Sequence, residues 1–479
     1  MKKQHLDKII SLCKRKGFVF PNSEIYGGLK ASYDYGPLGV ELKKLISELW
    51  WKEMTQSHQN IVGLDSAIMV HPDVWEASGH IANFNDPMTD NKDNKKRYRI
   101  DDLLSQQKSK VIDAICSALK IDSTKSDDIY NDMAHALLSN GSKYDGVLEQ
   151  AGVIDPYSGS IGKWTPAIQF NLMFKTDSGP SEKTGKNIYL RPETAQGIFI
   201  NYLLVQQTMR LKVPFGIAQI GKAFRNEIIA RNFIFRTREF EQMEMQYFVH
   251  PSEDVDNMDL WKQKRLDFYL NHLGIKSKNL KFHQHSKDAL AHYAKDAYDI
   301  EYNFPFGWGE VEGIHNRTDF DLKQHESLSG KNMTYFDTKT QEKYHPYIIE
   351  TSTGLNRLFL MVLCEAYFED TDNNRVVLRL PYDLAPIKAV ICPLVKKDGL
   401  PEKAMSVFET LNKEFPCIYD EQGSIGKRYY RQDEAGTPFG ITLDHQTLED
   451  ESVTIRERDS MKQTRVSIDK ISAFIHDNK

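Results

Sequence analysis

Two segments, far apart in the chain, carry the side chains from which we expect chemistry. The first is RNEIIARNFIFRTREFEQMEMQYF, residues 225–248, which sets four arginines and four glutamates among phenylalanines and methionines. The second is ETSTGLNRLFLMVLCEAYF, residues 350–368, in which Arg357 stands at the beginning of a strongly apolar helix. Arginine binds phosphate bidentately, and a guanidinium or an aromatic ring stacks on a flat base. The two segments therefore favour a nucleotide-binding site.

Strand alternation predicts how the first segment presents its side chains. Successive side chains of a strand point to opposite faces. In AQIGKAFRNE, Arg225 and Glu227 share a face with small residues that leave room for a ligand. In EFEQMEMQYF, Gln242, Glu244 and Gln246 share one face. We expect an antiparallel hairpin with a cationic, aromatic tip, IIARNFIFRTR. From spacing alone, an exposed hairpin held by salt bridges is an equal alternative.

The rest of the chain predicts the elements that position these segments. Residues 36–54, GPLGVELKKLISELWWKEM, form an amphipathic helix with Pro37 near its start, followed by a short strand, IVGLDSAIMV. Polar, helix-prone composition indicates an inserted subdomain over 83–164. Residues 254–300 read as mostly helical. After the proline-containing RLPYDLAP, strands and helices alternate, which predicts a separate small α/β domain over 386–479.

Composition limits the possible functions. The 479 residues allow two or three domains, and the net charge of −5 gives no indication of nucleic acid. The longest apolar run at a helix, LFLMVL, is too short to span a bilayer, and the sequence MKKQHLDKII lacks the features of a signal peptide. Five scattered cysteines without a CxxC pair favour reduced thiols in a cytoplasmic protein.

Two unrelated enzyme classes find no support. GPSEKTGKN spaces Gly179 and Gly185 one residue too far apart for a P-loop and ends in Asn187 rather than Ser or Thr. The histidines of KFHQHSKDALAHY do not form the HExxH motif of a metalloprotease. These observations exclude a P-loop ATPase and a zinc protease of that type.

The ordered motifs resemble a known family. FRNE followed by RNFIF, and then GLNRLFLMVL, is similar to motifs 2 and 3 of class II aminoacyl-tRNA synthetases, with motif 1 at 36–70. YDYGPLGVELK, SGHIANFNDP, FNLMFKT, YLRPETAQGIF, WGEVEGI and RTDFDL extend the resemblance to the homodimeric glycyl-tRNA synthetase family. The C-terminal KRYYRQDEAGTPFGITLD resembles that family's anticodon-binding domain.

The resemblance implies an α/β fold of the α+β type. Its catalytic domain, at 1–82 and 165–385, has the class II antiparallel sheet flanked by helices. An inserted helical subdomain spans 83–164, and an α/β anticodon-binding domain spans 386–479. Partners implied are ATP, glycine, tRNA(Gly) and a second copy of the chain, without a membrane. The candidate dimer contacts lie on the 36–54 helix: Leu38, Leu42, Ile46 and Trp50.

The resemblance also implies the nucleotide site. Arg225 would bind the α-phosphate of ATP, Arg357 the γ-phosphate, and Phe235 would stack the adenine, whose amino group Glu227 reads. Arg225, Arg357 and Glu227 would be the catalytic set. Glu310 would hold Mg²⁺, which prefers oxygen ligands. The full set of implied ATP-binding residues is Arg225, Asn226, Glu227, Phe235, Arg236, Arg238, Phe240, Glu310, Val311, Gly354 and Arg357.

Glycine poses a separate recognition problem, because it has no side chain to hold. A site selects it by binding the ammonium group and excluding any Cβ substituent. The implied glycine-binding residues are Arg99, Glu193, Phe240, Glu241, Glu244, Glu350, Ser352 and Gly354. No protein nucleophile is required, because the carboxylate of the amino acid attacks ATP, so catalysis is positioning and charge stabilisation.

Several features depart from the family pattern or leave alternatives. Asp65–Ser66 stand where motif 1 usually has a proline, and Ser352 replaces a generic class II glycine, as in the glycyl family. Many glycyl enzymes carry CxxC pairs in the insertion, but here Asn91, Asn94, Asp155 and Ser158 stand there, so we predict no structural zinc.

Two alternatives come from related proteins. One is an inactive homologue, such as the accessory subunit of a mitochondrial DNA polymerase, and the other is a prolyl or histidyl enzyme. The retained motif residues and the segments RPETAQ and EFEQME disfavour both. For the C-terminal domain, we expect local basic and aromatic residues to contact the anticodon arm: Lys427, Arg428, Tyr429, Tyr430 and Arg431.

Overall fold

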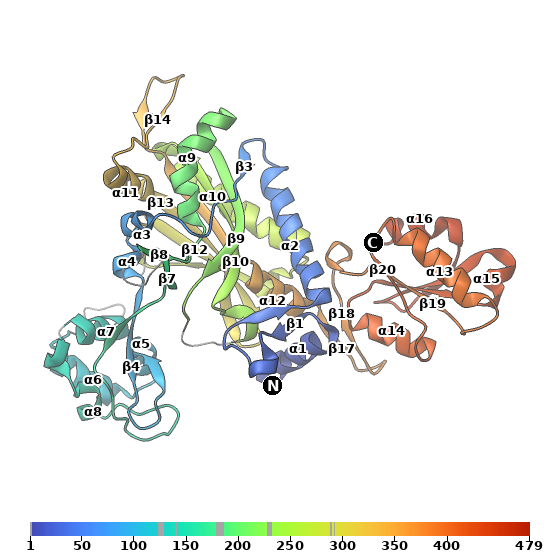
Figure 1. Ribbon diagram of the computed structural model, residues 1–479, viewed down its shortest axis with the longest axis horizontal. Coiled ribbons are helices and arrows are strands. Elements are labelled where there is room, and N and C mark those ends of the chain that lie inside the picture. Colours follow the sequence, from blue (N-terminus) through green and yellow to red (C-terminus); the bar gives the residue numbers. More distant parts are fainter. Residues whose placement is uncertain are drawn as a thin grey trace.

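The computed structural model describes residues 2–122, 129–139, 141–178, 186–227, 232–287, 290–291 and 293–479. A large body surrounds one sheet, an inserted unit lies at the lower left of Figure 1, and a C-terminal unit lies at the right. The inserted and C-terminal units each have their own cluster of buried apolar side chains. No helix in these described ranges is long and apolar enough to cross a membrane.

A seven-stranded sheet forms the centre of the body, in the order β11-β12-β13-β16-β10-β9-β3. All neighbouring strands are antiparallel except β3 and β9. The predicted antiparallel sheet is therefore confirmed, with one parallel strand at its edge. The strands are β3 (Ile61–Gly63), β9 (Phe215–Phe224), β10 (Glu239–Val249), β11 (Leu280–Gln284), β12 (Asp296–Phe304), β13 (Gly307–Thr318) and β16 (Tyr347–Gly354).

Helices cover both faces of this sheet. Met243 and Met245 of β10 pack into the large core cluster with helices α2 (Pro37–Thr55), α10 (Asp254–Asp267) and α12 (Leu355–Ala366). On the opposite face, Phe248 and Ile348 pack with α9 (Ala195–Met209) and α11 (Phe320–Ser329). Short elements complete the body: α1 (Lys2–Lys16), β1 (Val19–Pro21), β2 (Tyr33–Tyr35), α3 (Pro72–Ala77), α4 (His80–Asn83), β7 (Lys175–Ser178), β8 (Lys186–Tyr189), β14 (Tyr335–Phe336), β15 (Lys343–Tyr344), β17 (Tyr367–Asp370) and β18 (Arg375–Leu378).

The helix predicted at 36–54 is confirmed as α2, but its apolar stripe does not face a partner. Leu42, Ile46 and Trp50 are fully buried within the protomer's own core, and Leu38 packs against that core. The prediction that these residues form a dimer contact is therefore wrong for the three buried ones. An apolar stripe at helical spacing signals burial, and here α12 and the sheet supply the burial.

The segment 254–300 also differs from its prediction. Only α10 and short helical turns follow Asp254, and the chain then enters strands β11 and β12. In DAYDIEYNF, the sequence of β12, Ala297, Ile300, Tyr302 and Phe304 are buried. The register shift between Ile300 and Glu301 breaks the alternation, which hides the strand period from a sequence reading.

The inserted unit combines helices with a small sheet. A three-stranded sheet in the order β5-β4-β6 joins the unit to the body. Buried side chains such as Leu103, Ile115 and Met133 form its core. Its elements are β4 (Asn85–Asp90), β5 (Arg97–Arg99), α5 (Ile100–Ser105), α6 (Ser109–Leu119), α7 (Ile129–Ser139), α8 (Val147–Gln150) and β6 (Ile168–Asn171).

The C-terminal unit is the predicted small α/β domain. Its sheet has the order β20-β19-β21-β22-β23, parallel for the first three strands and antiparallel for the rest. The run IKAVICPLV becomes the fully buried strand β19. The elements are β19 (Ala389–Pro393), α13 (Leu400–Leu411), β20 (Cys417–Tyr419), α14 (Ile425–Asp433), β21 (Phe439–Leu443), α15 (His445–Asp450), β22 (Ser452–Glu457), β23 (Gln463–Ser467) and α16 (Ile471–Asp477).

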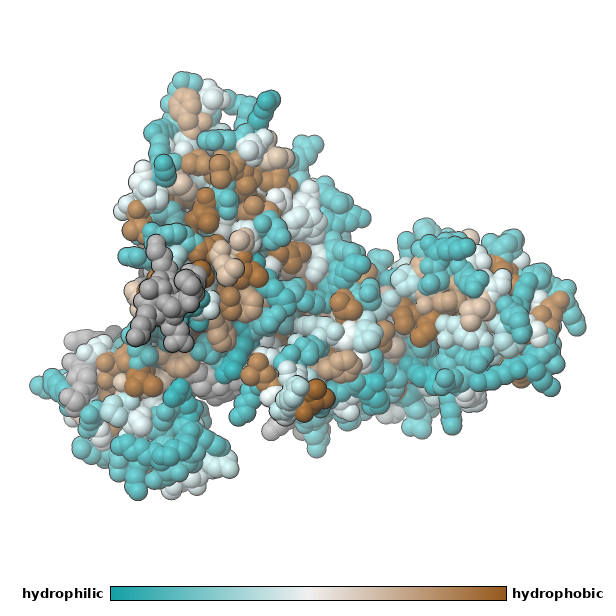
Figure 2. Space-filling view, viewed as in Figure 1, coloured by the Kyte–Doolittle hydropathy of each residue, from teal (hydrophilic) through white to brown (hydrophobic). Residues whose placement is uncertain are grey.

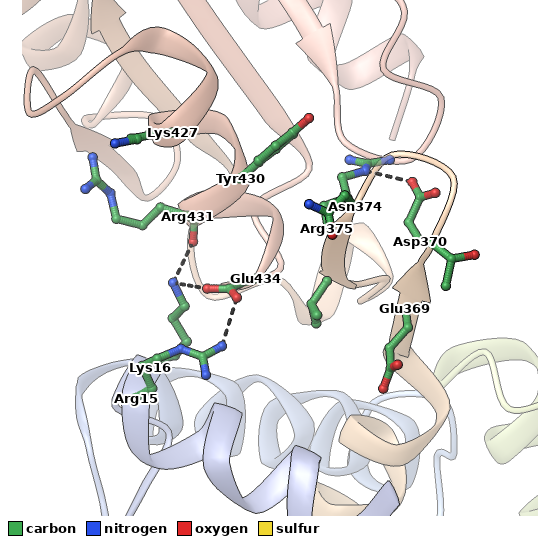
Figure 3. A pocket seen from close by; sticks show the side chains of 12 residues that line it. Arg15, Lys16, Glu369, Asp370, Asn374, Arg375, Lys427, Tyr430, Arg431 and Glu434 are labelled. Atoms are coloured by element: carbon green, nitrogen blue, oxygen red, sulfur yellow. Dashed lines mark hydrogen bonds and ion pairs between the residues drawn. The ribbon is translucent and has the colours of Figure 1, made fainter.

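Charged side chains hold this unit against the body. The buried Arg375 of β18 donates to Asp433 Oδ2 of α14 at 2.7 Å. Next to it, Arg15 and Lys16 of α1 pair with Glu434 at 2.8 and 2.6 Å, around a cavity of about 560 Å³ (Figure 3). The buried Arg375–Asp433 pair requires a fixed geometry, so it sets the position of α14 relative to β18.

Candidate active site

Segment 225–248 forms the predicted antiparallel hairpin. Strands β9 and β10 pair throughout their length, and Arg225 directly follows β9. The predicted alternation on β10 is confirmed: Met243 and Met245 join the core under α2 and α12, so Gln242 and Glu244 face the other side. Residues 228–231 of the expected basic loop lie outside the described residues.

A cavity of about 120 Å³ lies between this hairpin, β16 and the beginning of α12. Among the predicted residues, it is lined by Arg225, Glu227, Phe235, Arg236, Phe240, Glu310, Ser352, Gly354 and Arg357. Three other predicted residues have different surroundings. Asn226 N–H bonds to Leu172 O, Arg238 Nε donates to Glu227 O at 3.1 Å, and Val311 is buried in the core. The structure therefore brings residues from three distant segments to one cavity.

Arg357 and Phe235 form one wall of this cavity. The guanidinium carbon of Arg357 lies 4.6 Å from the Phe235 ring centroid, and its Nη1 lies 3.0 Å from Glu310 Oε2. The charge of Arg357 lowers the pKa of Glu310, although burial opposes its ionisation. The Phe235 ring and the Arg357 guanidinium thus lie together, and this arrangement suits a planar base attached to phosphates.

Arg225 forms the opposite wall. Its Nε donates to Pro192 O at 3.1 Å, and its guanidinium lies 5.5 Å from the ring centroids of both Phe84 and Phe240. Aromatic rings on two sides and one backbone bond hold the guanidinium in place, and no ion pair joins it to an acidic side chain in the described part of the chain. A cation held in this way is available to an anionic ligand at low reorganisation cost.

Next to the cavity lies an acid cluster, formed by Glu193, Glu244 and Glu350, which three separate elements bring together. Glu193 precedes α9, Glu244 lies on β10, and Glu350 lies on β16. Gln246 Nε2 donates to Glu244 Oε1 at 2.6 Å and to Glu350 Oε2 at 2.7 Å. Thr194 Oγ1 donates to the other oxygen of Glu244. These bonds fix the directions of the carboxyl groups before any ligand binds.

Cationic or protonatable side chains surround the acid cluster. The buried Arg317 donates its Nη1 to Glu350 Oε2 at 2.9 Å. His315 Nδ1 lies 2.9 Å from Glu350 Oε1, and His80 Nε2 lies 3.3 Å from Glu193 Oε2. The cluster is therefore held by partners on β13 and α4 as well as by its own three elements.

The three carboxyl groups differ in their ionisation. Burial raises the pKa of Glu244 well above its usual range, and the nearby charges of Glu350 and Glu193 raise it further. Burial also opposes ionisation of Glu350, but Arg317 and His315 outweigh it and lower the pKa of Glu350. His80 likewise outweighs burial at Glu193 and lowers the pKa of that carboxyl. The cluster therefore favours two carboxylates and one neutral carboxyl, Glu244.

Sequence reasoning did not identify the partners of the acid cluster. His80 and Arg317 stand inside the quoted motifs SGHIANFNDP and RTDFDL, yet no role was assigned to them. Arg317 and Asp321 have the spacing of an ion pair on a helix, and Arg317 does contact both oxygens of Asp321. His315 and Arg317 stand two residues apart on β13, and this spacing was the available signal that both face the same side.

Two residues of the predicted glycine-binding set, Arg99 and Glu241, form ion pairs with residues outside the acid cluster. Arg99 pairs with Asp101 at 2.5 Å and with Asp86 at 3.1 Å. Glu241 pairs with Lys43 of α2 at 2.5 Å, on the strand face opposite to Glu244. Both are occupied by partners in this structure.

In the insertion, Asn94 and Asp155 are in direct contact. Both stand where many glycyl enzymes carry CxxC pairs. Asn94 Nδ2 donates to Asp155 Oδ2 at 2.6 Å, and Tyr98 OH donates to Asp155 Oδ1 at 2.5 Å. The backbone N–H groups of Tyr157 and Ser158 also donate to this carboxylate. Amide and hydroxyl groups are poor zinc donors, so this set does not fit a tetrahedral zinc site. Hydrogen bonds to one buried carboxylate join the two loops instead.

Helix α14 corrects part of the expected anticodon surface. Arg428 is buried, with its guanidinium donating to Pro393 O and Gly423 O. Tyr429 is also buried and its hydroxyl bonds to Thr442 Oγ1. The prediction that these two residues contact nucleic acid is therefore wrong, because their polar atoms are used inside the domain. Lys427 and Tyr430 remain exposed.

Comparison with known proteins agrees with this geometry. The family model described as tRNA synthetase class II core domain (G, H, P, S and T) matches residues 174–367. The anticodon binding domain model matches residues 388–478. Among solved structures, the prolyl-tRNA synthetase of Giardia lamblia in complex with prolyl-adenylate superposes with a TM-score of 0.64 at 15% identity. That match covers 98% of this chain and 75% of the other, and it shows a shared fold.

Curated relatives are similar over nearly the whole chain. The glycine–tRNA ligase of Chlorobaculum tepidum is 50% identical over 476 residues, which cover 98% of this chain and 99% of the relative. That of Treponema denticola is 50% identical over 96% of this chain and 94% of its own length. That of Macrococcus caseolyticus is 48% identical over 99% of both chains. With its class II core, this chain therefore belongs to the glycine–tRNA ligase family of class II aminoacyl-tRNA synthetases.

Proposed function

We propose that this chain is an ATP-dependent glycine–tRNA ligase, which activates glycine as glycyl-adenylate and transfers it to the 3′ end of tRNA(Gly). The observation that carries the proposal is the position of the acid cluster beside the arginine-lined cavity, on adjacent strands of one sheet. The acid cluster suits an ammonium group, and the arginine-lined cavity suits a nucleoside triphosphate. The full-length similarity to glycine–tRNA ligases supports the same reaction.

In the first step, an oxygen of the glycine carboxylate attacks the α-phosphorus of ATP. The new oxygen–phosphorus bond forms as the bond to pyrophosphate breaks, and pyrophosphate leaves with its electron pair. Arg225 binds the α-phosphate, and Arg357 binds the γ-phosphate. Phe235 packs on the adenine, and Glu227 accepts a hydrogen bond from its amino group. These residues lower the barrier by positioning and by stabilising charge on phosphorus.

ATP brings a divalent cation, for which we propose Mg²⁺. The carboxylate of Glu310 lines the cavity, is partly exposed, and has a lowered pKa, so it fits as a single protein ligand. Magnesium commonly binds one or two carboxylates together with substrate phosphates and water. The described residues contain no group of three or more acidic, His or Cys side chains that would hold a metal alone. When bound with ATP, the ion neutralises phosphate charge.

Glycine binds through its charged ends. Its ammonium group is attracted to the acid cluster, where Glu193 and Glu350 have lowered pKa values. Ser352 and Gly354 of β16 line the adjoining cavity. Arg317 and Gln246 hold Glu350 from behind, so its direction does not depend on the ligand. The close, hydrogen-bonded wall excludes larger amino acids.

The second step requires tRNA(Gly), which we propose to be recognised in part by the C-terminal domain. We propose three domains: a catalytic domain at 1–82 and 165–385, an insertion at 83–164, and a domain for the anticodon arm at 386–479. The match of 388–478 to an anticodon binding domain is consistent with that boundary. Five cysteines, all free, are consistent with a cytoplasmic site of action.

We also infer that the enzyme is a homodimer, as in the family that it resembles. The short strand β3 at the edge of the main sheet supports this, since an edge strand leaves backbone groups for another chain. Figure 2 further shows apolar side chains on the face over α9, where Leu204 and Met209 are exposed. Light scattering at micromolar concentration should give twice the mass of one chain. A monomeric mass with full activity would contradict the dimer.

One assay tests the proposed function against its alternatives. ATP–pyrophosphate exchange should be fast with glycine and weak with each other amino acid. Exchange with proline or histidine instead would identify a different class II enzyme. No exchange with any amino acid would indicate an inactive homologue. Charging of tRNA(Gly) transcripts with labelled glycine then tests the transfer step.

A further inference from the structure

Gln242 occupies a distinctive place on the sheet. The residues directly opposite it are Gly221 on β9 and Gly354 on β16. Of the three residues in this row across the sheet, only Gln242 has a side chain. That side chain lines the cavity next to Ser352. A Cβ at Gly221 would lie 2.2 Å from Arg191 Nη2, so a side chain there would displace the buried Arg191 guanidinium.

The amide of Gln242 joins two walls of the site. Its Oε1 accepts a hydrogen bond from the backbone N–H of Thr194 at 3.1 Å. Its Nε2 donates to Ser352 Oγ at 3.3 Å. Thr194 follows Glu193 at the beginning of α9, whereas Ser352 lies on β16 two residues after Glu350. One side chain on β10 thus links the elements that carry two members of the acid cluster.

This link matters because the proposed substrate is the smallest amino acid. A pocket that can yield discriminates a single methyl group by only about 10- to 200-fold. Stronger exclusion requires walls that cannot move apart when a methyl group enters. The wall at Thr194 is already attached to β10 through Glu244, which accepts from Thr194 Oγ1. Ser352 Oγ of β16 is linked to β10 by the hydrogen bond that it accepts from Gln242 Nε2.

We propose that Gln242 is a specificity-determining positioning residue, which excludes alanine by holding Thr194 and Ser352 at a fixed separation. The inference rests on the proposed function, because it assigns the basis of amino-acid choice within that site. Gln242 does not need to touch the amino acid, and its role is to keep two walls from separating. Losing its amide leaves the acid cluster and the arginines in place, so glycine activation continues while the exclusion of alanine weakens.

The test compares kcat/KM for glycine and for alanine in ATP–pyrophosphate exchange. Gln242→Met has a similar length but offers neither hydrogen bond. We expect the glycine-to-alanine ratio to fall by about tenfold or more, mainly through a rise in alanine activation. Because both amino acids carry the same ammonium group, changes in charge at the acid cluster cancel in this ratio.

A second variant keeps the test valid if Gln242→Met does not fold. Gln242→Leu likewise offers neither hydrogen bond, and its branched apolar side chain packs differently from that of methionine, so the ratio should again fall by about tenfold or more. The matched control is Gln107→Met in the insertion, because Gln107 also bridges two segments, through Leu103 O and Ile154. Its ratio should equal that of wild type even if its stability falls.

The outcomes are distinct. A ratio within about twofold of wild type in a folded Gln242→Met or Gln242→Leu protein would overturn the proposal. An equal fall in the Gln107→Met control would do so as well, because the effect would then be general. A wild-type protein without glycine-dependent exchange would instead contradict the proposed function, and that result appears before any variant is measured.

Discussion

Arg317 Nη1 lies 2.9 Å from Glu350 Oε2, and both side chains are buried. Arg317 also contacts Asp321, so one guanidinium serves a carboxylate of the acid cluster and a carboxylate of α11. The pair explains why Glu350 keeps a low pKa in a buried site, whereas Glu244 does not. Arg317 and His315 together thus favour the charged form of Glu350, and His80 does the same for Glu193.

The first prediction concerns the phosphate ligands. Arg225→Ala and Arg357→Ala should each lower glycine-dependent exchange by about a hundredfold or more, since a lost contact to the transition state costs on the order of 3 kcal/mol. Thermal unfolding should change little, because Arg357 pairs with the partly exposed Glu310 and Arg225 has no ion pair among the described residues. Arg97→Ala, in an exposed pair with Asp90, is the control. Near-normal exchange in either site variant would contradict the ATP assignment.

The second prediction concerns Glu244, whose pKa is raised by burial and by neighbouring carboxylates. A neutral carboxyl attracts the glycine ammonium weakly, so the KM for glycine should fall as pH rises and Glu244 ionises. Glu244→Gln should raise this KM and remove that part of the pH dependence. The comparison variant is Glu239→Gln, on the same strand but exposed and paired with Lys222. Identical KM–pH profiles for wild type and Glu244→Gln would refute the assignment.

The third prediction concerns stability and pH. The hydrogen bond and charge of Glu350 outweigh burial and raise the pKa of His315 above its usual 6.5. The folded state then binds this proton more tightly than the unfolded state does. Its contribution to stability is complete below pH 6.5 and is lost as pH rises through the folded pKa.

The unfolding temperature, measured from about pH 5.5 to about pH 8.5, tests this effect, because histidine titrates in that range. The His315→Gln protein should show a smaller loss of stability across that range than wild type. His445→Gln, at an exposed position in the C-terminal domain, serves as the reference. Equal slopes for wild type and His315→Gln would exclude the link.

The fourth prediction concerns the insertion. The buried Asp155 accepts hydrogen bonds from Asn94, Tyr98 and two backbone N–H groups. Asp155→Ala should leave those donors unsatisfied, each at a cost of about 1–3 kcal/mol, and so lower the unfolding temperature. Because hydrogen bonds rather than zinc join the loops, a chelator should not change the unfolding of wild type. A chelator-induced loss together with bound zinc would contradict this.

The fifth prediction concerns α14. Lys427→Ala and Tyr430→Ala should raise the KM for tRNA(Gly) and leave glycine-dependent exchange unchanged, because both side chains are exposed and neither lines the active-site cavity. Arg428→Ala should instead destabilise the domain, since two backbone carbonyls would lose their donor. Unchanged tRNA charging in both exposed variants would remove α14 from the RNA surface.

The sequence by itself determined the local elements and the main motifs. Alternation in EFEQMEMQYF predicted that Gln242, Glu244 and Gln246 share a face, because the period of a strand is a local property. The helix at 36–54 and the α/β character of 386–479 were predicted for the same reason. The ordered motifs around Arg225 and Arg357 indicated a nucleotide site, and the structure places both residues on one cavity.

Only the tertiary structure decided which partners these elements meet. The stripe with Ile46 and Trp50 signalled burial, but periodicity does not say whether a core or a second chain provides it. The basic run at α14 looked like a surface, yet Arg428 is turned inward to satisfy backbone carbonyls. The pairing of Arg317 with Glu350 joins different strands, and burial among several carboxylates set their ionisation. Such contacts arise from long-range packing, which local spacing does not encode.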